Sequence, residues 1–442
     1  MASVIALTTL TTGAFILRAV KFDGCRSARI GLSGLVGLGL MGSVIGLALT
    51  LQMPITLATF AIFLVPGIGC AVSISKSRYL ERDEEKERGN PLAIFAVCLL
   101  LLLALIGVLT PSTSLDWDSI AYHLAVPAIW VRQGHAGPIS YIHPSNFPGA
   151  VDSWFTVGEL IGGQTAAKVF TWWFTTFGCL AIFGFIKERF NSTSAWLCTI
   201  AFASIPMVMW ESGTAYIDVA NGLFAGFGFV FAAQYVEKRE KSDLILAAVM
   251  LSFAAGSKYT GLQAIFIASL VVLLLINKPD KLGAVKMGGL ATILSSFWYI
   301  KNWILVGNPV YPFFYGVFGG KNWDTFQGKI YSDEQKTFGY QGPQSLGQSI
   351  LGLVTSPGRF TNPFPTLGYG SAHVSLGFAV AVGAVIGIVK GLVSKFDRSL
   401  APHDSDSACC LVRPQPAEPI YSHPRRTDAV LLRASPRMEA NE

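Results

Sequence analysis

The chain has 442 residues, of which 52% are hydrophobic and only 14% are charged. About a quarter of the residues of a typical soluble domain are charged, so this composition excludes an ordinary soluble protein and predicts a chain that crosses a membrane several times. The net charge of +6 does not indicate nucleic-acid binding, because basic residues in a membrane chain usually mark its cytoplasmic loops.

A helix needs about twenty mainly apolar residues to cross a bilayer. In chain order, the segments that approach this requirement are residues 3–20, 30–50, 54–73, 91–110, 163–186, 194–210, 218–235, 243–257, 260–277, 287–304 and 373–392. They predict an all-α polytopic membrane protein with about eleven transmembrane helices and with interfacial helices in its external loops.

The loops between these segments alternate in character. Short loops that contain lysine and arginine, such as 75–88 and 237–241, fall on one side, and the two long loops, 111–162 and 305–372, fall on the other. Cytoplasmic loops carry an excess of lysine and arginine, so both long loops are expected to lie outside the cytoplasm. This topology predicts an integral, multi-pass membrane protein whose two long loops lie in the periplasm or lumen.

The same pattern divides the chain into three parts. Residues 1–90 are expected to form N-terminal transmembrane helices, and residues 91–392 a core with the two external loops. Residues 393–442 are polar and rich in proline, a composition that cannot bury enough apolar surface to fold. We expect a disordered cytoplasmic tail there.

The first long loop contains "LDWDSIAYHLAVPAIWVRQG", residues 115–134, which is too polar to be a span. Its interleaved apolar residues and Pro127 are typical of a bent helix in the membrane interface. On such a helix Asp118 and Tyr122 share one face, so a carboxylate and a phenol can point at one spot. The alternative is that Asp118 only caps the start of the helix.

Other charged residues fall near the external ends of the predicted spans. They include Asp152 and Asp218, and acidic residues at span ends are costly and more often functional. Lys258 and Lys301 break the positive-inside pattern, because the predicted topology places both outside. Two cations near several carboxylates predict a site for an anionic ligand. Either lysine alone is explained equally well by contact with lipid headgroups.

Five segments together resemble a known family: "DWDSIAYHLAVPAIWVRQG", "HPSNFPGAVDSW", "GTAYID", "GSKYTGL" and "KNWILVGNPVYPFFYGVFGG". Their order and loop positions resemble those of bacterial GT-C membrane glycosyltransferases, which include dolichyl-phosphate-mannose protein mannosyltransferase-like and lipid A aminoarabinose transferase-like members. The resemblance covers about residues 91–392 and implies a protein of the bacterial inner (plasma) membrane whose site faces the periplasm or exterior. It implies inverting transfer of a hexosyl or pentosyl group from a polyprenyl-phosphate donor to a glycan, lipid or protein acceptor, on the outer face of the membrane.

The resemblance also implies residue roles. The first-loop acidic residue of the family, followed four positions later by tyrosine, matches Asp118 and Tyr122. Asp116 is nearby, and the second external acidic residue resembles Asp218. These three aspartates are the expected catalytic residues.

The family's phosphate-binding basic residues resemble Lys258 and Lys301, although close relatives more often have arginine at the second position. Relatives in the aminoarabinose branch carry a lysine before the prolines of the first loop. This chain has "HPSNFP" there, so His143 is the expected substitute. The further substrate-binding residues expected from these motifs are Tyr122, His123, Asp152, Tyr259 and Asn302.

The chemistry of the reaction agrees with these residue types. Polyprenyl phosphate is a good leaving group, so one carboxylate suffices as base for the acceptor hydroxyl, and positive charge stabilises the departing phosphate. No metal-ligand spacing is present in the sequence. A divalent metal ion is an open alternative, with Asp118 and Asp218 as its ligands if the loops bring them together.

Two other classes of protein remain as alternatives. A transporter is expected to show repeated halves with broken helices, and the sequence has no internal repeat. A protein that binds polyprenyl lipids without catalysis needs the lysines but not Asp118.

Overall fold

Helices form the regular structure of the residues that this computed structural model describes, 1–77, 79–80, 89–276 and 281–337, and these residues contain no strand. The all-α fold class is therefore confirmed for the described part of the chain. The helices are α1 Ala2–Ala19, α2 Arg26–Thr50, α3 Leu57–Ser77, α4 Pro91–Leu109, η1 Ser114–Asp116, η2 Ser119–His123, α5 Ala125–Gln133, η3 His143–Asn146, α6 Asp152–Arg189, α7 Ser192–Ser204, α8 Pro206–Glu211, α9 Asp218–Lys238, α10 Lys241–Ser257, α11 Thr260–Leu275, α12 Leu282–Val306, α13 Tyr315–Phe318 and α14 Thr325–Thr337.

Six of the described helices are long and apolar enough to cross a membrane. They are α1, α2, α3, α4, α6 and α9. Every segment predicted as a span within residues 1–306 falls on a helix, but 194–210 is divided between α7 and α8, because Pro206 cannot continue the hydrogen bonding of a helix. The predicted span 373–392 and the predicted tail 393–442 lie outside the described residues.

Small residues allow α2 to approach its neighbours closely. A Cβ atom added to Gly31 would lie 2.2 Å from the backbone nitrogen of Ala181 on α6, and one added to Gly34 would enter the ring of Phe177. Such contacts between backbones are typical of helix packing in membranes, where lipid supplies no hydrophobic drive for association. These contacts hold α2 against α6, the helix that begins at Asp152.

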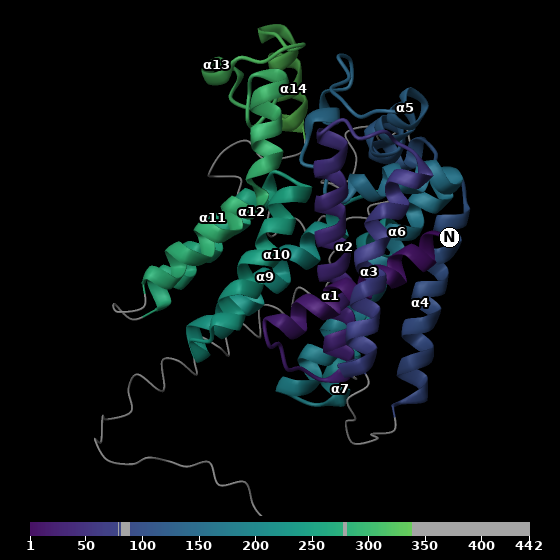
Figure 1. The fold of residues 1–442 in the computed structure, drawn as a ribbon, viewed down its shortest axis with the longest axis vertical. Coiled ribbons are helices and arrows are strands. Elements are labelled where there is room, and N and C mark those ends of the chain that lie inside the picture. The colour runs from purple at the N-terminus through teal and green to yellow at the C-terminus, as the bar shows by residue number, and fades with distance from the viewer. Residues whose placement is uncertain (78, 81–88, 277–280, 338–442) are drawn as a thin grey trace, which may run out of the picture. The chain divides into compact units, whose positions relative to one another are not determined.

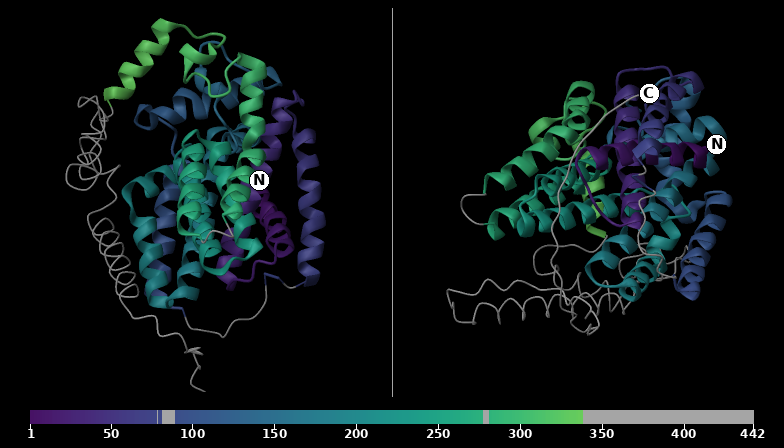
Figure 2. Two further views of the ribbon diagram at one scale, coloured as in Figure 1. Left: turned by 90° about the vertical axis from the view of Figure 1, so that its left-hand side faces the viewer. Right: turned by 60° about the horizontal axis from the view of Figure 1, so that its bottom comes forward.

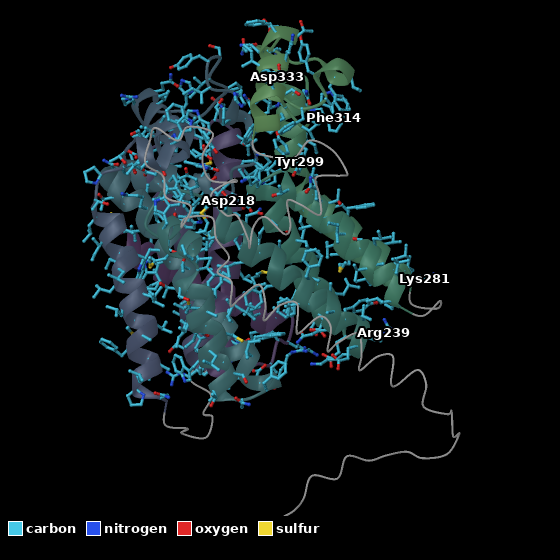
Figure 3. All side chains as sticks on the ribbon, turned by 180° about the vertical axis from the view of Figure 1, so that it is seen from behind. Asp218, Arg239, Lys281, Tyr299, Phe314 and Asp333 are labelled. Carbon is cyan, nitrogen blue, oxygen red and sulfur yellow. The ribbon has the colours of Figure 1, made fainter. Side chains whose placement is uncertain are left out.

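The two ends of these helices carry different connections. Figure 3 shows Phe314 and Asp333 at one end and Arg239 and Lys281 at the other, with Asp218 between them. The helices α5, α13 and α14 lie at the end marked by Phe314 and Asp333, which we call the loop end, and the left view of Figure 2 shows the residues of α14 at the same end. The end marked by Arg239 and Lys281 is the basic end. The side of the membrane that each end faces stays a prediction.

The helix α6 begins earlier than its predicted span. It starts at Asp152 rather than at 163, and its backbone is non-helical at Gly162 and Gly163. Gly163 has a φ of +67°, a left-handed conformation that glycine adopts without steric cost. The stretch before this break carries Asp152 to the loop end.

The helix predicted within residues 115–134 is not continuous in the structure. It is divided into η1, a π-helical turn η2 and α5, and the amide of Leu124 donates to the carbonyl of Ser119, 2.8 Å away. Pro127 lacks an N–H group and its ring would clash with the carbonyl four residues earlier, which explains the widened turn before it. A bend at Pro127 was expected, but a π-turn was not.

Candidate functional site

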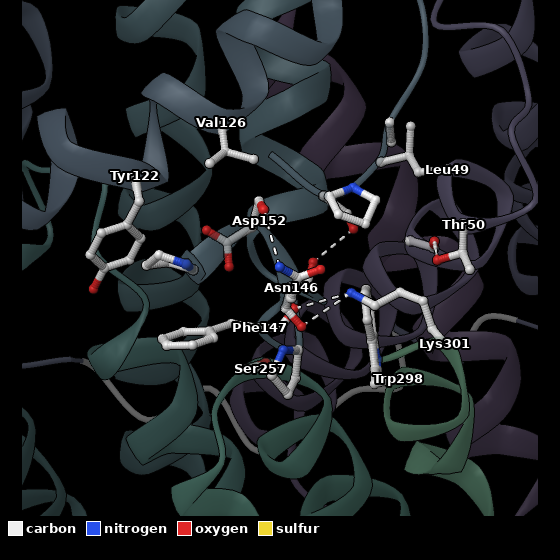
Figure 4. Close-up of a pocket in the computed structure, with 18 of the residues that line it drawn as sticks. Leu49, Thr50, Tyr122, Val126, Asn146, Phe147, Asp152, Ser257, Trp298 and Lys301 are labelled. Atoms are coloured by element: carbon white, nitrogen blue, oxygen red, sulfur yellow. Dashed lines mark hydrogen bonds between the residues drawn. The ribbon is translucent and has the colours of Figure 1, made fainter. Parts of the chain in front are cut away.

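Two cavities adjoin near the loop end of the described helices. The first, which we call the polar cavity, has a volume of about 280 Å³. Figure 4 shows Tyr122 and Lys301 on opposite sides of this cavity, with Asp152 between them. Its ionisable lining residues other than tyrosines are His123, Asp152, Lys258 and Lys301. Two lysines and one carboxylate therefore line this cavity, and one of the lysines, Lys258, is paired with Asp218 outside it.

The second cavity, which we call the apolar groove, has a volume of about 830 Å³. Its polar lining residues are Asp118, Glu211, Tyr216 and Asp218. The rest of its lining is apolar or glycine: Ile182, Phe185, Ile186, Phe202, Ile205, Met207, Val208, Val219, Gly222, Leu223, Gly226, Phe227 and Val230. Along α9 the groove extends from Asp218 to Val230, a rise of about 18 Å at 1.5 Å per residue.

No described residue lines both cavities, but two pairs of residues connect them. Lys258 lines the polar cavity, and its Nζ donates to Oδ1 of Asp218, which lines the groove, at 2.5 Å. Tyr122 lines the polar cavity and lies beside Asp118, which lines the groove. These two pairs define what we call the junction.

The position of Asp118 is fixed through its backbone. Its N–H donates to Oη of Tyr216 at 3.2 Å, and the hydroxyl of Ser119 accepts from the N–H of Ala215 at 3.1 Å. The Asp118 side chain makes no capping hydrogen bond, although the residue precedes η2. The interpretation of Asp118 as only a helix cap therefore has no hydrogen bond to support it, and its carboxylate faces the groove.

The negative charge of Asp118 affects the pKa values of two neighbouring tyrosines. Burial, together with the charge of Asp118 and a hydrogen bond to it, raises the pKa of Tyr122. Burial and the Asp118 charge also raise the pKa of Tyr216. Both phenols are therefore protonated at neutral pH, and the predicted pairing of Asp118 with Tyr122 agrees with this geometry.

Lys258 carries its positive charge among three carboxyl groups. Burial acts to lower the pKa of Lys258, but the charges of Asp218, Glu211 and Asp118 outweigh it and raise the pKa. The lysine is therefore an ammonium ion at neutral pH. Its position at the start of α11 brings this charge to the junction.

Glu211, at the end of α8, completes the acidic end of the groove. Its side chain is 1% exposed, and its Oε2 accepts from the N–H of Val219 at 3.1 Å. Burial and then the charge of Asp218 raise the pKa of Glu211 to about 8, although Lys258 and the Val219 hydrogen bond favour the charged form. Glu211 is therefore largely protonated at pH 7, which reduces the negative charge around Asp118.

Replacing Glu211 with glutamine is expected to weaken the pH dependence of stability. The unfolded chain releases the Glu211 proton near pH 4.5 and the folded chain near pH 8, so folding is favoured below the first value and loses this contribution as pH rises through the second. The variant Glu211→Gln is neutral throughout. Thermal unfolding in detergent from pH 5 to 8.5 checks this, and equal pH slopes for the variant and the parent would contradict it.

His123 and Asp152 form a close pair on the wall of the polar cavity. Nδ1 of His123 lies 2.5 Å from Oδ1 of Asp152, and the histidine is 3% exposed. The His123 ring lies over Tyr122, with a centroid distance of 4.2 Å. This pair fixes the orientation of Tyr122 next to the junction.

Lys301 reaches the polar cavity from α12. Its Nζ donates to the carbonyls of Asn146 and Phe147 at 3.3 and 3.5 Å and lies 5.4 Å from the centre of the Trp298 ring. Among the described residues it has no carboxylate within ion-pair distance. Lys301 therefore offers a positive charge to an anion bound in this cavity.

Tyr259 and Asn302 support that wall of the cavity. Nδ2 of Asn302 donates to Oη of Tyr259 at 3.0 Å, and Oη of Tyr259 donates to the carbonyl of Tyr311 at 2.8 Å. Tyr259 lines the polar cavity and Asn302 does not. The structure thus gives Asn302 a contact with Tyr259 rather than with the cavity.

His143 lies in an aromatic cluster and does not line either cavity. Its ring contacts those of Phe147, Trp323 and Tyr331, with centroid distances of 5.0 to 5.7 Å. Burial lowers the pKa of His143 to about 4. The histidine is neutral at pH 7, so it does not supply the positive charge expected at this position.

Asp116 is separated from the junction. It is 5% exposed, and its Oδ1 accepts from the N–H of Thr113 at 2.6 Å in a capping box around η1. Lys168, which is 1% exposed, donates to the carbonyls of Gly107 and Thr110 at the end of α4 and lies near Asp116. Asp116 therefore holds the loop that precedes Asp118.

Tyr216 and Lys168 were not predicted as site residues. Glu211 and Tyr216 lie in "ESGTAYID" immediately before Asp218, and Glu211 carries the same signal as Asp218, an acidic residue at the end of a predicted span. Lys168 is a charged residue inside a predicted span, a type of position that often indicates function or a specific buried contact.

The carboxyl groups at the junction do not form a cation site. Among the described residues no group of three or more histidine, cysteine, aspartate or glutamate side chains has metal-binding geometry. Oδ1 of Asp218 already accepts a hydrogen bond from the ammonium of Lys258. The donor set does not fit a divalent metal, and we derive no step through one.

Comparison with known proteins gives one similarity. Residues 151–346 match a family model described as a domain of unknown function, DUF8201. The matched segment includes Asp152, Glu211, Asp218, Lys258 and Lys301, whereas Asp118 and Tyr122 precede it. No curated protein and no solved structure matches the chain.

Proposed function

We propose that this chain is an inverting membrane glycosyltransferase, which moves a sugar from a polyprenyl-phosphate donor to an acceptor hydroxyl. The observation that supports this most is the separation of charge at the junction. Two lysines line the polar cavity, with Asp152 as its one carboxylate, whereas Asp118, Glu211 and Asp218 line the end of the groove. Inverting transfer needs a cation for the departing phosphate and a base for the incoming hydroxyl on opposite sides of the anomeric carbon.

The polar cavity is the side that suits the donor phosphate. Lys258 and Lys301 both line it, against the single carboxylate of Asp152. In the groove the same phosphate would lie beside Asp118 and Asp218 and be repelled. Leu49 and Leu305 add apolar surface to the cavity at α2 and α12, and the lipid chain of the donor would pass these residues into the bilayer.

Asp118 is the carboxylate best placed to act as base. The other acidic side chains near the junction contact a lysine, a histidine or a backbone N–H: Asp116 contacts the Thr113 N–H, Asp152 contacts His123, Asp218 contacts Lys258, and Glu211 contacts the Val219 N–H. Asp118 has no cationic partner among the described residues within ion-pair distance. Its side chain accepts a hydrogen bond from the phenol of Tyr122, which carries no positive charge.

The proposed reaction is a single displacement. The acceptor oxygen forms a bond to the anomeric carbon while the bond from that carbon to the phosphate oxygen breaks. The acceptor proton passes to the Asp118 carboxylate, and the electron pair leaves with the phosphate, whose charge Lys258 and Lys301 stabilise. A positioned base of this kind typically contributes about 10² to 10⁴ in rate.

The test is a transfer assay with the purified full chain in lipid nanodiscs. Polyprenyl phosphates carrying radiolabelled hexoses or pentoses serve as donors, with a bacterial membrane extract as the source of acceptors. We expect donor to be consumed only when acceptor is present, and only by protein with Asp118 intact. Donor binding without consumption for every sugar would instead favour a lipid-binding protein without catalysis.

A further inference from the structure

The apolar groove is formed between helices rather than within a loop. It is lined by α6 and α9, both long and apolar enough to cross a membrane. Its extent along α9, about 18 Å, is more than half of the roughly 30 Å thickness of a bilayer core. Whatever occupies the groove therefore extends into the membrane from the junction.

The side chains of the groove that can form hydrogen bonds lie only at its junction end. Beyond Asp118, Glu211, Tyr216 and Asp218, its lining has no polar side chain. A soluble glycan in this space would leave hydroxyl groups without partners, and each such group costs about 5- to 150-fold in affinity. A hydrocarbon chain, by contrast, gains affinity from every methylene that it buries.

The polar end of the groove suits a neutral hydroxyl. Asp118 carries the negative charge there, Asp218 is paired with Lys258, and Glu211 is held in its protonated form by burial. A hydroxyl group donates its hydrogen bond to a carboxylate, whereas an anionic headgroup would be repelled by it. The charges at this end of the groove therefore favour a ligand that presents a hydroxyl group, rather than an anionic group, to Asp118.

We propose that the apolar groove binds the acceptor, and that the acceptor is a membrane lipid with a free hydroxyl group. Its hydrocarbon chain lies along α6 and α9, and its hydroxyl reaches Asp118. This inference rests on the glycosyltransferase function proposed above and assigns the acceptor class. The bonds formed and broken are those already given, with the lipid oxygen as nucleophile and Asp118 as the proton acceptor.

Two glycines allow the groove to be filled without disturbing the helix. Gly222 and Gly226 line the groove from α9, and a Cβ atom added to either would meet no other heavy atom within 4 Å. Leucine is also a better helix former than glycine. The variant Gly226→Leu should therefore fold and occupy space that the lipid chain needs, and Gly222→Leu is the second variant of the same design.

Gly289→Leu is the matched control. Gly289 lies on α12, is exposed, lines neither cavity, and would also accept a Cβ atom without contact. All three variants are compared for transfer from a labelled donor to vesicles of bacterial total lipid, to a water-soluble oligosaccharide and to a hydroxyl-rich peptide. Donor binding is measured in parallel.

We expect the label to enter the chloroform–methanol phase, bound to lipid. Gly226→Leu and Gly222→Leu should lower transfer by at least about tenfold, the loss expected when two methylene contacts are displaced, mainly by raising KM for the lipid. Donor binding, and every property of Gly289→Leu, should stay within about twofold of the parent.

Label in peptide or soluble oligosaccharide would overturn the lipid assignment while the transferase function stands. Normal transfer by both groove-filling variants would do the same. If the parent consumes no donor with any acceptor, the proposed function itself fails.

Discussion

Replacing Asp118 with asparagine is expected to reduce sugar transfer by roughly 10² or more, the scale of a lost general base. Asparagine keeps the size of the side chain but cannot accept the acceptor proton. The protein should accumulate and bind donor normally, because the Asp118 side chain makes no capping hydrogen bond and its N–H still donates to Tyr216. Single-turnover rates and donor affinity in nanodiscs measure the two quantities separately.

Asp116→Asn is the matched control for this variant. The asparagine oxygen can still accept from the Thr113 N–H, as Asp116 does in the capping box around η1. We expect activity within about fivefold of the parent, because Asp116 lines neither cavity. A nearly active Asp118→Asn beside an inactive Asp116→Asn would contradict the choice of base.

Replacing Lys258 with glutamine is expected to weaken donor binding roughly 10- to 100-fold, the range for a lost hydrogen bond to a charged group. Turnover should fall as well, because the phosphate gains negative charge as the bond to the sugar breaks. Titration of the variant with a short-chain polyprenyl phosphate gives the affinity. The ratio of kcat/KM between parent and variant, measured with the labelled donor, gives the loss of transition-state stabilisation.

Asp218→Asn tests the same contact from the other side of the junction. Lys258 now binds Asp218 at 2.5 Å, so a neutral partner should release the ammonium for the phosphate. Donor affinity should then be unchanged or higher, whereas Lys301→Gln should lower it as Lys258→Gln does. Weaker donor binding by Asp218→Asn would mean that Lys258 has to be held by this carboxylate to bind the phosphate.

Much of the helical architecture was predictable because it depends on local composition. Long apolar runs such as 30–50 and 91–110 must be helical in a membrane, where each backbone polar group needs a partner within its own segment. The early start of α6 was not predictable, because residues 152–161 resemble the polar loop before them. Nor was the π-turn at Ser119–His123, since a widened turn depends on tertiary contacts such as the one between Ser119 and Ala215.

The candidate site was predictable only in part. Asp118, Tyr122, Asp218 and Lys258 meet at the junction, as expected from charged residues at span ends. The pairing of Lys258 with Asp218, 40 residues apart in the chain, could not be read from spacing. Assigning Asp116 to a cap and His143 to an aromatic cluster required burial and neighbours, which a single sequence does not contain.

The existence of two cavities without a shared lining residue has a kinetic consequence. Because donor and acceptor would occupy different cavities, neither has to leave before the other binds. The reaction therefore needs no covalent intermediate between the sugar and the protein. Double-reciprocal plots at several acceptor concentrations should therefore intersect rather than run parallel. Isotope exchange between donor and free polyprenyl phosphate should be absent until acceptor is added.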